Sequence, residues 1–179
     1  LIGAISTGLA GKISFVGSGS EDTRFIISGD LNDFALNFDG GGGTNIVDFS
    51  GFNAYSIEIS ADQLTSVDRL IGGPDASDEF VGSSLNAGNF TVTGETSATY
   101  REGESKTIEI EGFSNLVGSI FDDTFVIDAG VGTTFDGELL GSDGDDRFEF
   151  VSGSVNGISG QENATNAGDV IDYSAINED

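Results

Sequence analysis

The sequence predicts an all-β chain folded as a parallel β-helix, or β-solenoid, of about eight coils. Three observations support this prediction: short segments in which apolar and polar residues alternate, turn-like glycines that recur at about the length of one coil, and an internal repeat. At ~4.8 Å per stacked coil, such a solenoid would form a rod of roughly 38 Å. The alternative fold is an antiparallel β-sandwich.

Four segments alternate most clearly between apolar and polar residues, with the two-residue period of a half-buried strand. They are residues 34–38, 55–59, 107–110 and 170–173. In each segment the apolar side chains would face a core and the polar or acidic ones would face solvent. Helix is nearly absent from the prediction, since only residues 61–68 fit a single helical turn.

Turn-like glycines mark the expected corners of the coils. They are Gly17, Gly40, Gly72, Gly94, Gly118, Gly141 and Gly160. Most of these glycines are separated by about 20 to 25 residues, the length of one coil of a parallel β-helix. The strands of a sandwich would instead recur at about 8 to 12 residues without this longer period.

Two stretches of the chain, residues 17–52 and 141–176, align without a gap at an offset of 124 residues. Both begin with Gly-Ser, continue with an acidic pair and Ser-Gly, and reach an Asp-aromatic-Ser sequence near their ends. We expect them to form equivalent coils, with Asp48 and Asp172 in matching positions and Tyr173 in the core like Phe49. Residues 1–179 are interpreted as a single β-solenoid segment, an excerpt of a longer repetitive protein.

Four turns share a signature in which a glycine is followed by an acidic cluster and then by phenylalanine. They span residues 16–25, 73–80, 118–125 and 141–148. Only the phenylalanine is apolar enough to anchor such a turn in a core. The side chains expected to point inward are therefore Phe25, Phe80, Phe125 and Phe148.

Residues 141–148 follow the nonapeptide pattern G-G-x-G-x-D-x-U-x, with Asp146 at the aspartate position and Ser142 in place of one glycine. Residues 40–47 fit the same frame, with Asn45 at the aspartate position. Glycines in such a turn let the backbone adopt positive φ, and the aspartate supplies a hard oxygen ligand.

These turns resemble the RTX (haemolysin-type) calcium repeats. Residues 43–50, 112–118 and 122–125 also resemble repeats in very large bacterial surface and adhesin-like proteins. The resemblance implies a solenoid that is extracellular or on the cell surface, with calcium as the ion bound by its acidic turns.

The candidate metal ligands are the carboxylates of the last two acidic turns. They are Asp143, Asp145 and Asp146, followed by Asp122 and Asp123. Calcium takes six to eight oxygen ligands, and RTX sites obtain them from tandem nonapeptides, whereas the nonapeptides of this chain are isolated. The competing interpretation is that these aspartates cap turns by accepting hydrogen bonds from nearby backbone amides.

Composition restricts the chemistry available to the chain. It has 31 acidic and 6 basic residues, a net charge of −25, and neither cysteine nor histidine. The charge disfavours nucleic acid and anionic lipid as partners, and no apolar stretch has the length of a membrane span. Thiol nucleophiles, Ser-His-Asp triads and the usual zinc sites are excluded. The chain is predicted not to be an enzyme, with no catalytic and no cofactor-binding residues.

The expected function is that of a structural and adhesive extracellular segment of a large repetitive bacterial surface protein, stabilised by calcium. Its expected partners are neighbouring repeats of the same chain, and polysaccharide or another cell surface. The alternative function is a calcium-binding accessory module of a secreted polysaccharide-modifying enzyme.

Overall fold

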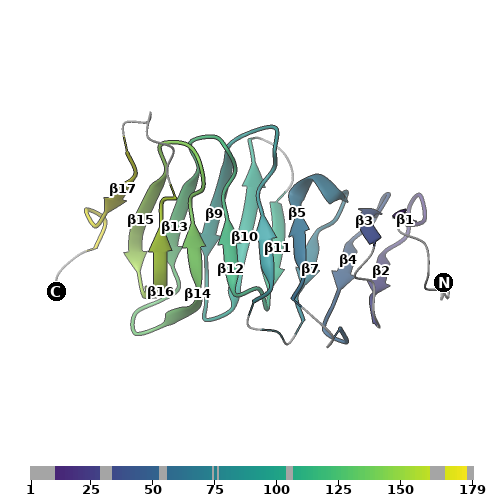
Figure 1. Cartoon of the computed structure of the whole chain (residues 1–179). Coiled ribbons are helices and arrows are strands. Elements are labelled where there is room, and N and C mark those ends of the chain that lie inside the picture. Colours follow the sequence, from purple (N-terminus) through teal and green to yellow (C-terminus); the bar gives the residue numbers. More distant parts are fainter. Residues whose placement is uncertain are drawn as a thin grey trace.

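The structure, a computed structural model, describes residues 11–28, 34–52, 56–73, 75, 77–103, 107–161 and 168–176. These residues form a β-solenoid of about six turns that is nearly all β, with 2% helix. The prediction of a parallel β-solenoid is confirmed. Figure 1 shows the strands stacked side by side along a rod, from β1 at one end to β17 at the other.

The strands belong to three sheets, with the orders β1-β3-β6 in sheet A, β17-β15-β13-β9-β10-β11-β7-β4-β2 in sheet B and β16-β14-β12-β8-β5 in sheet C. The elements are β1 (Gly11–Val16), β2 (Thr23–Ile26), β3 (Phe34–Asp39), β4 (Asn45–Asp48), β5 (Glu58–Ser60), the 3₁₀ helix η1 (Ala61–Gln63), β6 (Leu64–Thr65), β7 (Arg69–Ile71), β8 (Glu79–Val81), β9 (Gly88–Val92), β10 (Ser97–Glu102), β11 (Thr107–Glu111), β12 (Asn115–Val117), β13 (Thr124–Asp128), β14 (Thr134–Leu140), β15 (Arg147–Ser152), β16 (Ser154–Ser159) and β17 (Val170–Asp172).

A typical coil consists of a strand in sheet A or C, a glycine turn and a strand in sheet B. The sequence β14, turn and β15 forms one such coil, and β12, turn and β13 forms the coil before it. Neighbouring coils pair in parallel and in register, so that Phe125 on β13 lies between Phe90 on β9 and Phe148 on β15. The two-residue period of each strand therefore places equivalent residues of successive coils in columns along the rod.

The chain passes between sheets C and A in one coil that is interrupted by η1. Strand β5 pairs with β8 in sheet C, and β6 pairs with β3 in sheet A. Ser60 caps η1 by accepting a hydrogen bond from Asp62 N at 3.3 Å, while Ser60 N donates to Gln63 Oε1 at 2.8 Å. This capping box explains the single helical turn that was predicted within residues 61–68.

Strands β9, β10 and β11 form an antiparallel meander inside the otherwise parallel sheet B. Gly94, expected at a corner of a coil, lies instead in the β9–β10 hairpin, where Thr93 N donates to Ser97 O at 2.9 Å. The hairpin adds strands to one sheet without adding a full coil. The solenoid consequently has about six turns, fewer than the eight coils expected.

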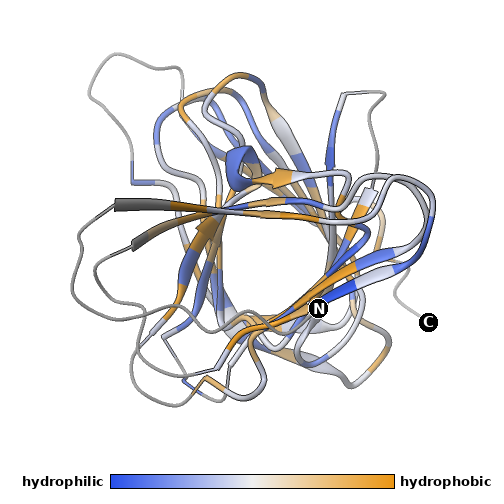
Figure 2. Ribbon diagram, turned by 90° about the vertical axis from the view of Figure 1, so that its right-hand side faces the viewer, coloured by the Kyte–Doolittle hydropathy of each residue, from blue (hydrophilic) through white to orange (hydrophobic). Residues whose placement is uncertain are grey.

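The core contains a column of aromatic side chains that follows the rod. Phe90, Phe125 and Phe148 are stacked, with ring centroids 4.6 Å and 4.9 Å apart. These distances match the ~4.8 Å between neighbouring strands, because one ring comes from each successive coil. The rings of Phe80 and Tyr100 lie 5.1 Å apart at an edge-to-face angle beside the column. Figure 2 looks along the rod, with the strands surrounding this core.

The inward-pointing phenylalanines were predicted correctly. Phe80, Phe125 and Phe148 are fully buried, and Phe25, on the edge strand β2, is partly buried and packs against the same core. The prediction for Tyr173 was wrong, because its side chain is 58% exposed although Phe49 is only 1% exposed. Phe49 lies in a coil whose next coil covers it, whereas Tyr173 follows the edge strand β17 and stacks on Phe150, with ring centroids 4.6 Å apart.

Candidate functional site

The acidic pairs of the turns divide between solvent and core. Asp122 and Asp145 are exposed, whereas Asp123 and Asp146 are each only 1% exposed. This division follows from the period of an extended backbone, in which consecutive side chains point to opposite sides. The pairs therefore form two separate columns of carboxylates, an outer one and an inner one.

In the outer column each carboxylate reaches forward to a backbone amide of the next coil. Thr44 N donates to Asp22 Oδ1 at 2.7 Å, and Asp145 N donates to Asp122 Oδ1 at 2.9 Å. Gly168 N donates in turn to Asp145 Oδ1 at 3.2 Å. The outer carboxylates thus tie successive coils together at the corner of the rod.

In the inner column the direction is reversed, because each carboxylate accepts from a backbone amide of the preceding coil. Three of these contacts have N···O distances between 2.6 Å and 3.0 Å. The pairs, donor first, are Asn45 and Asp68, Gly88 and Asp123, Asp123 and Asp146, and Asp146 and Asp169. Inner and outer carboxylates together satisfy amides that the strand ladders leave without a partner at the corners.

The second oxygen of an inner carboxylate closes its own turn. Asp78 Oδ2 accepts from Gly73 N at 2.7 Å while its Oδ1 accepts from Ile57 N of the preceding coil at 2.8 Å. Asp123 Oδ2 likewise accepts from Ser119 N at 2.5 Å. Burial raises the pKa of both aspartates, although these amide hydrogen bonds act in the opposite direction.

A glycine makes room for each of these buried side chains. A Cβ atom on Gly118 would lie 2.6 Å from Asp123 Oδ2, and a Cβ on Gly141 would overlap Asp146 Oδ2. The shared spacing is a glycine followed five positions later by an aspartate or asparagine. It occurs at Gly40 and Asn45, Gly73 and Asp78, Gly118 and Asp123, and Gly141 and Asp146. Gly17 and Asp22 have the same spacing, although Asp22 is exposed. This spacing was readable in the sequence but was not recognised there, which is why buried Asp78 was missed.

Asp146 differs from the other inner carboxylates in one contact. Its Oδ1 accepts from Asp123 N, but its buried Oδ2 has no hydrogen-bond partner among the described residues. Ser142, at the position that corresponds to Ser119, has φ +73° and its amide does not bond Asp146. Burial, followed by the nearby charges of Asp123, Asp169 and Asp122, raises the pKa of Asp146 to about 7.

Asn45 occupies the same place in an earlier turn and is neutral. Its Nδ2 donates to the carbonyl oxygens of Gly42, Gly43 and Ser66 at 3.2, 3.3 and 2.9 Å. The position therefore accepts a neutral side chain that carries a donor. Protonated Asp146 has the same chemical character, whereas ionised Asp146 would be an unpaired buried charge.

Four of the five predicted metal ligands lie in these two columns. Oxygens of Asp122, Asp123, Asp145 and Asp146 accept from backbone amides, and Asp143 is half-buried in the turn that contains Asp146. No group of three or more acidic side chains in the described ranges is placed to hold a metal ion. The observed contacts are those of turn and coil capping.

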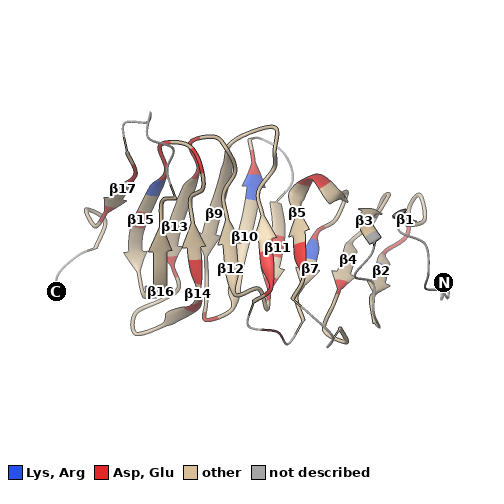
Figure 3. Cartoon of the chain, viewed as in Figure 1, with Lys and Arg blue, Asp and Glu red and all other residues tan. Residues whose placement is uncertain are grey.

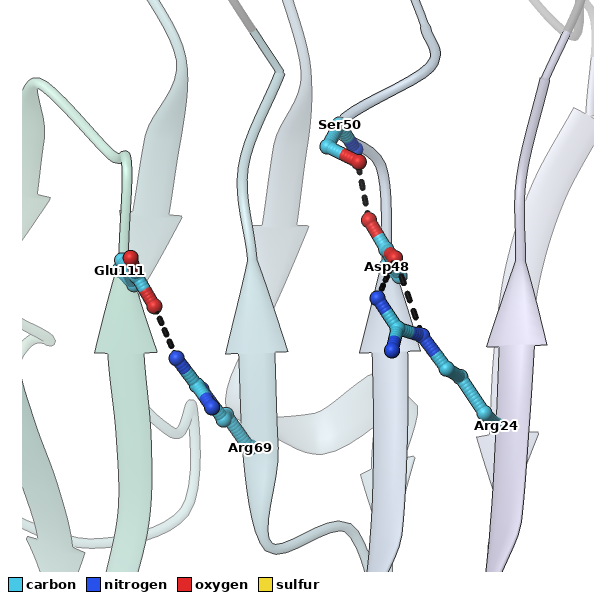
Figure 4. Close-up of polar contacts among 5 residues, drawn as sticks. All are labelled: Arg24, Asp48, Ser50, Arg69 and Glu111. Carbon is cyan, nitrogen blue, oxygen red and sulfur yellow. Dashed lines mark hydrogen bonds and ion pairs between the residues drawn. The ribbon is translucent and has the colours of Figure 1, made fainter.

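Exposed arginines on sheet B form a second set of links between coils (Figure 4). Arg24 on β2 pairs with Asp48 on β4, and Arg69 on β7 pairs with Glu111 on β11. In each case the acid lies on the next strand of the sheet and two residues further along the register. Ser50 N also donates to Asp48 Oδ1 at 2.9 Å, and hydrogen bonds from Ser50 and Arg24 lower the pKa of Asp48 despite its burial.

The same arrangement recurs at the other end of the rod. Arg147 on β15 pairs with Asp172 on β17, and Ser174 N donates to Asp172 Oδ1 at 2.7 Å. Asp48 and Asp172, which the sequence offset pairs, therefore have equivalent partners. The two arginines differ by 123 positions and not by 124, since the chain gains one residue between the first glycine turn and β2.

Acidic side chains are spread along the whole rod, with few basic ones among them (Figure 3). No helix in the described part of the chain has the length and apolarity that a membrane crossing requires. No protein-family model, curated protein or solved structure matches the chain. The fold is thus of the repeat-type β-solenoid kind, and the resemblance to RTX and adhesin-like repeats depends on the short turn motifs alone.

Proposed function

We propose that this chain is a structural and adhesive segment of a large repetitive bacterial surface protein, acting as a stiff acidic rod outside the cell. The observation that supports this proposal is the continuity of contacts between coils. Strand pairing, the aromatic column and the carboxylate columns each link one coil to the next. Bending the rod would have to break several of these contacts at once, so the fold favours stiffness.

The acidic surface suits an exposed, repetitive protein. A net charge of −25 makes separate rods repel one another at low salt and keeps the surface hydrated. It also disfavours contact with nucleic acid and with anionic lipid.

The adhesive part of the proposal assigns polysaccharide as the partner. A groove of about 620 Å³ lies beside β14, β15 and β16, and no charged residue is among those that line it. Its lining includes the hydroxyl side chains of Thr133, Thr134, Ser152 and Ser154, with Val131 at its rim. In so acidic a chain, a groove lined by hydroxyls and apolar groups favours a neutral glycan over a charged one.

Calcium remains part of the proposal in a narrower form. Since four of the five candidate carboxylates bond backbone amides, the oxygen best placed for a cation is the unpartnered Oδ2 of Asp146. Further ligands would have to come from backbone carbonyls of the same turn and from water. The alternative function, an accessory module of a polysaccharide-modifying enzyme, would also use the groove beside β14, β15 and β16 to bind the polysaccharide.

The rod is tested by measuring a distance between its ends. The chain contains no cysteine, so a double variant Ser18→Cys, Ser174→Cys can carry two spin labels at exposed positions of the end coils. A stiff rod predicts one narrow distance distribution in dilute solution. A broad distribution would contradict the structural role.

The adhesive role is tested by titrating the purified chain with neutral and acidic polysaccharides. Neutral glycans should bind more tightly, and Thr133→Glu, which places a charge in the groove, should abolish that binding. Ser84→Glu, an equal charge change at an exposed position outside the groove, is the matched control. Binding that is unaffected by Thr133→Glu would remove the groove from the proposal.

A further inference from the structure

Two glycine turns in the middle of the rod present apolar side chains to solvent. They are residues 82–87, between β8 and β9, and residues 118–123, between β12 and β13. Leu85 is 70% exposed, Ile120 64% and Phe121 37%. Both turns belong to interior coils, because β8 and β12 each have a paired strand on either side. The exposure of these three side chains therefore does not arise from an end of the solenoid.

The two turns lie on neighbouring coils and begin in the same way. Strands β8 and β12 pair in parallel and in register up to the first glycine of each turn. Ser83 Oγ accepts a hydrogen bond from Leu85 N, and Ser119 Oγ accepts one from Phe121 N, both at 3.1 Å. Both serines are buried. Each serine thus fixes the residue two positions later at the outside of the corner, so Leu85 and Phe121 hold equivalent places.

The next coil adds no side chain at this place. Its turn, residues 141–146, has Gly144 at the position that corresponds to Phe121. A Cβ atom on Gly144 would lie 2.5 Å from Phe121 O, so the two backbones lie against each other. Ser20 and Gly43 occupy the corresponding position in the two turns between sheets A and B. A large apolar residue at this position is therefore not required to build the turn.

Carboxylates lie beside these apolar side chains on the neighbouring coils. Asp62 of the preceding coil accepts from Ser83 Oγ at 2.8 Å and from Ser84 N at 3.0 Å. Asp122 follows the exposed ring in its own turn, and it accepts from Asp145 N of the next coil at 2.9 Å. All three aspartates are exposed, and the three turns contain no basic residue. The apolar side chains thus have a negatively charged rim.

We infer that Leu85, Ile120 and Phe121, here called the corner patch, form a docking site for a basic and apolar peptide segment of a separate protein. Exposed apolar side chains that occur singly need no explanation, whereas those gathered on neighbouring coils inside a polar rim are typical of an interaction site. Apolar residues of the segment cover the corner patch, and its lysines or arginines meet the carboxylates of the rim.

Charge selects this partner over other occupants of the corner patch. A second copy of the chain carries the same charge of −25 and the same rim, so repulsion opposes it, and anionic lipid is opposed in the same way. The rim also favours a cationic partner over a neutral glycan. The corner patch shares no residue with the groove beside β14, β15 and β16, so the inference goes beyond the proposed function.

The test is the affinity of the 179-residue chain for two synthetic peptides, measured by fluorescence anisotropy at physiological salt. The probe contains six lysines, two leucines and two phenylalanines, and the comparison peptide has glycine at its four apolar positions. Because the two peptides carry the same charge, the ratio of their affinities reports apolar contact and not general attraction to an acidic chain. We expect the probe to bind about tenfold more tightly, or better, since it buries the corner patch.

The double variant Leu85→Ser, Phe121→Ser should bind both peptides with similar affinity. Val131→Ser is the matched control and should retain the preference, because Val131 is 96% exposed and lies outside the corner patch. Since the substituted side chains are exposed, the melting temperatures of the variants should match that of the wild type. A third peptide with glutamate in place of every lysine should not bind the wild type.

Several results would overturn the inference. The two lysine peptides binding the wild type equally would show that charge alone attracts them, and a preference that survives in the double variant would place the apolar contact elsewhere. Self-association of the wild type that the double variant loses, measured by sedimentation velocity, would identify a second copy as the occupant. Binding to phosphatidylcholine vesicles that the double variant loses would identify a lipid surface instead. None of these outcomes depends on the stiffness of the rod or on glycan binding.

Discussion

Asn45 and Asp146 occupy equivalent positions in two glycine turns but differ in whether they can ionise. The amide of Asn45 donates to three carbonyl oxygens at any pH. The carboxyl of Asp146 is equally buried and is surrounded by the charges of Asp122, Asp123 and Asp169. Like Asn45, it has one oxygen without a hydrogen-bond partner among the described residues. The pKa of Asp146, raised to about 7, means that the folded chain retains a proton which an unfolded aspartate has released.

Stability should therefore fall as pH rises toward neutrality. Between pH about 4 and about 7 the folded state binds one more proton at Asp146 than the unfolded state, so the unfolding free energy decreases with pH by about 1.4 kcal/mol per unit for that proton. Urea denaturation should give a higher unfolding free energy at pH 5 than at pH 7.5. Below pH about 4 the trend should reverse, since Asp48, Asp62 and Asp172 have lowered pKa values.

The variant Asp146→Asn isolates this effect. It places at position 146 the residue that position 45 already carries, and it should flatten much of the decrease in unfolding free energy between pH 5 and pH 7.5. Asp22→Asn, at an exposed outer-column position whose charge is not among those that raise the pKa of Asp146, is the control and should retain the wild-type slope. A slope unchanged by Asp146→Asn would mean that Asp146 is ionised in the folded chain.

Phe125 is the residue on which the aromatic column most depends. Its ring lies between Phe90 and Phe148 and is fully buried. Phe125→Ala should lower the unfolding free energy by ~3 to 5 kcal/mol, because it removes a large core side chain and leaves a cavity. Phe121→Ala, at a side chain that is 37% exposed, should change it by less than ~1 kcal/mol. Similar losses in the two variants, measured by urea denaturation, would contradict the importance of the column.

At the scale of elements, the glycine turn is the unit that repeats. The turn before β13 brings a backbone carbonyl of Gly141 and a carboxylate oxygen of Asp123 close to Gly118. It can do so because Gly118 has no Cβ, and not because its φ is positive. Gly141 also has no room for a side chain, because a Cβ atom there would overlap Asp146 Oδ2.

Gly118→Ala should therefore destabilise the chain through crowding, by ~1 to 3 kcal/mol. Gly19→Ala is the matched control, since a Cβ at Gly19 has no neighbour within 4 Å, and it should be neutral or slightly stabilising. Thermal melting followed by circular dichroism distinguishes the two. Equal melting temperatures for the two variants would show that the turn relaxes without cost.

At the scale of the whole molecule, the effect of bound calcium on the melting temperature must be distinguished from the effect of general charge screening. If a calcium ion binds the folded chain only, millimolar calcium raises the melting temperature beyond the effect of sodium at equal ionic strength. Asp146→Ala should remove much of that increment, whereas Glu58→Ala, at an exposed glutamate of sheet C, should retain it. The same melting temperature with calcium, with chelator and with sodium alone would leave the acidic turns stabilised by their backbone amides only.

Much of the local structure was determined by the sequence alone. Alternation in the segment 107–110 assigned the inward and outward sides of its strand, because successive side chains of an extended backbone point to opposite sides. The same period separates Asp145 from Asp146 and turns Phe148 into the core. These features depend on covalent geometry and on apolar burial within a few residues, both of which can be read from a short window of sequence.

Only the tertiary structure decided which strands became neighbours. Thr91 on β9 and Thr99 on β10 pair antiparallel, although their alternation would suit a parallel partner equally well. Likewise, the backbone amide that donates to each carboxylate lies about one coil away along the chain. The exposure of Tyr173 follows from its place after the edge strand β17. Pairing and coverage are set by competition among contacts distant in sequence, and a local pattern that is satisfied by several partners does not select one of them.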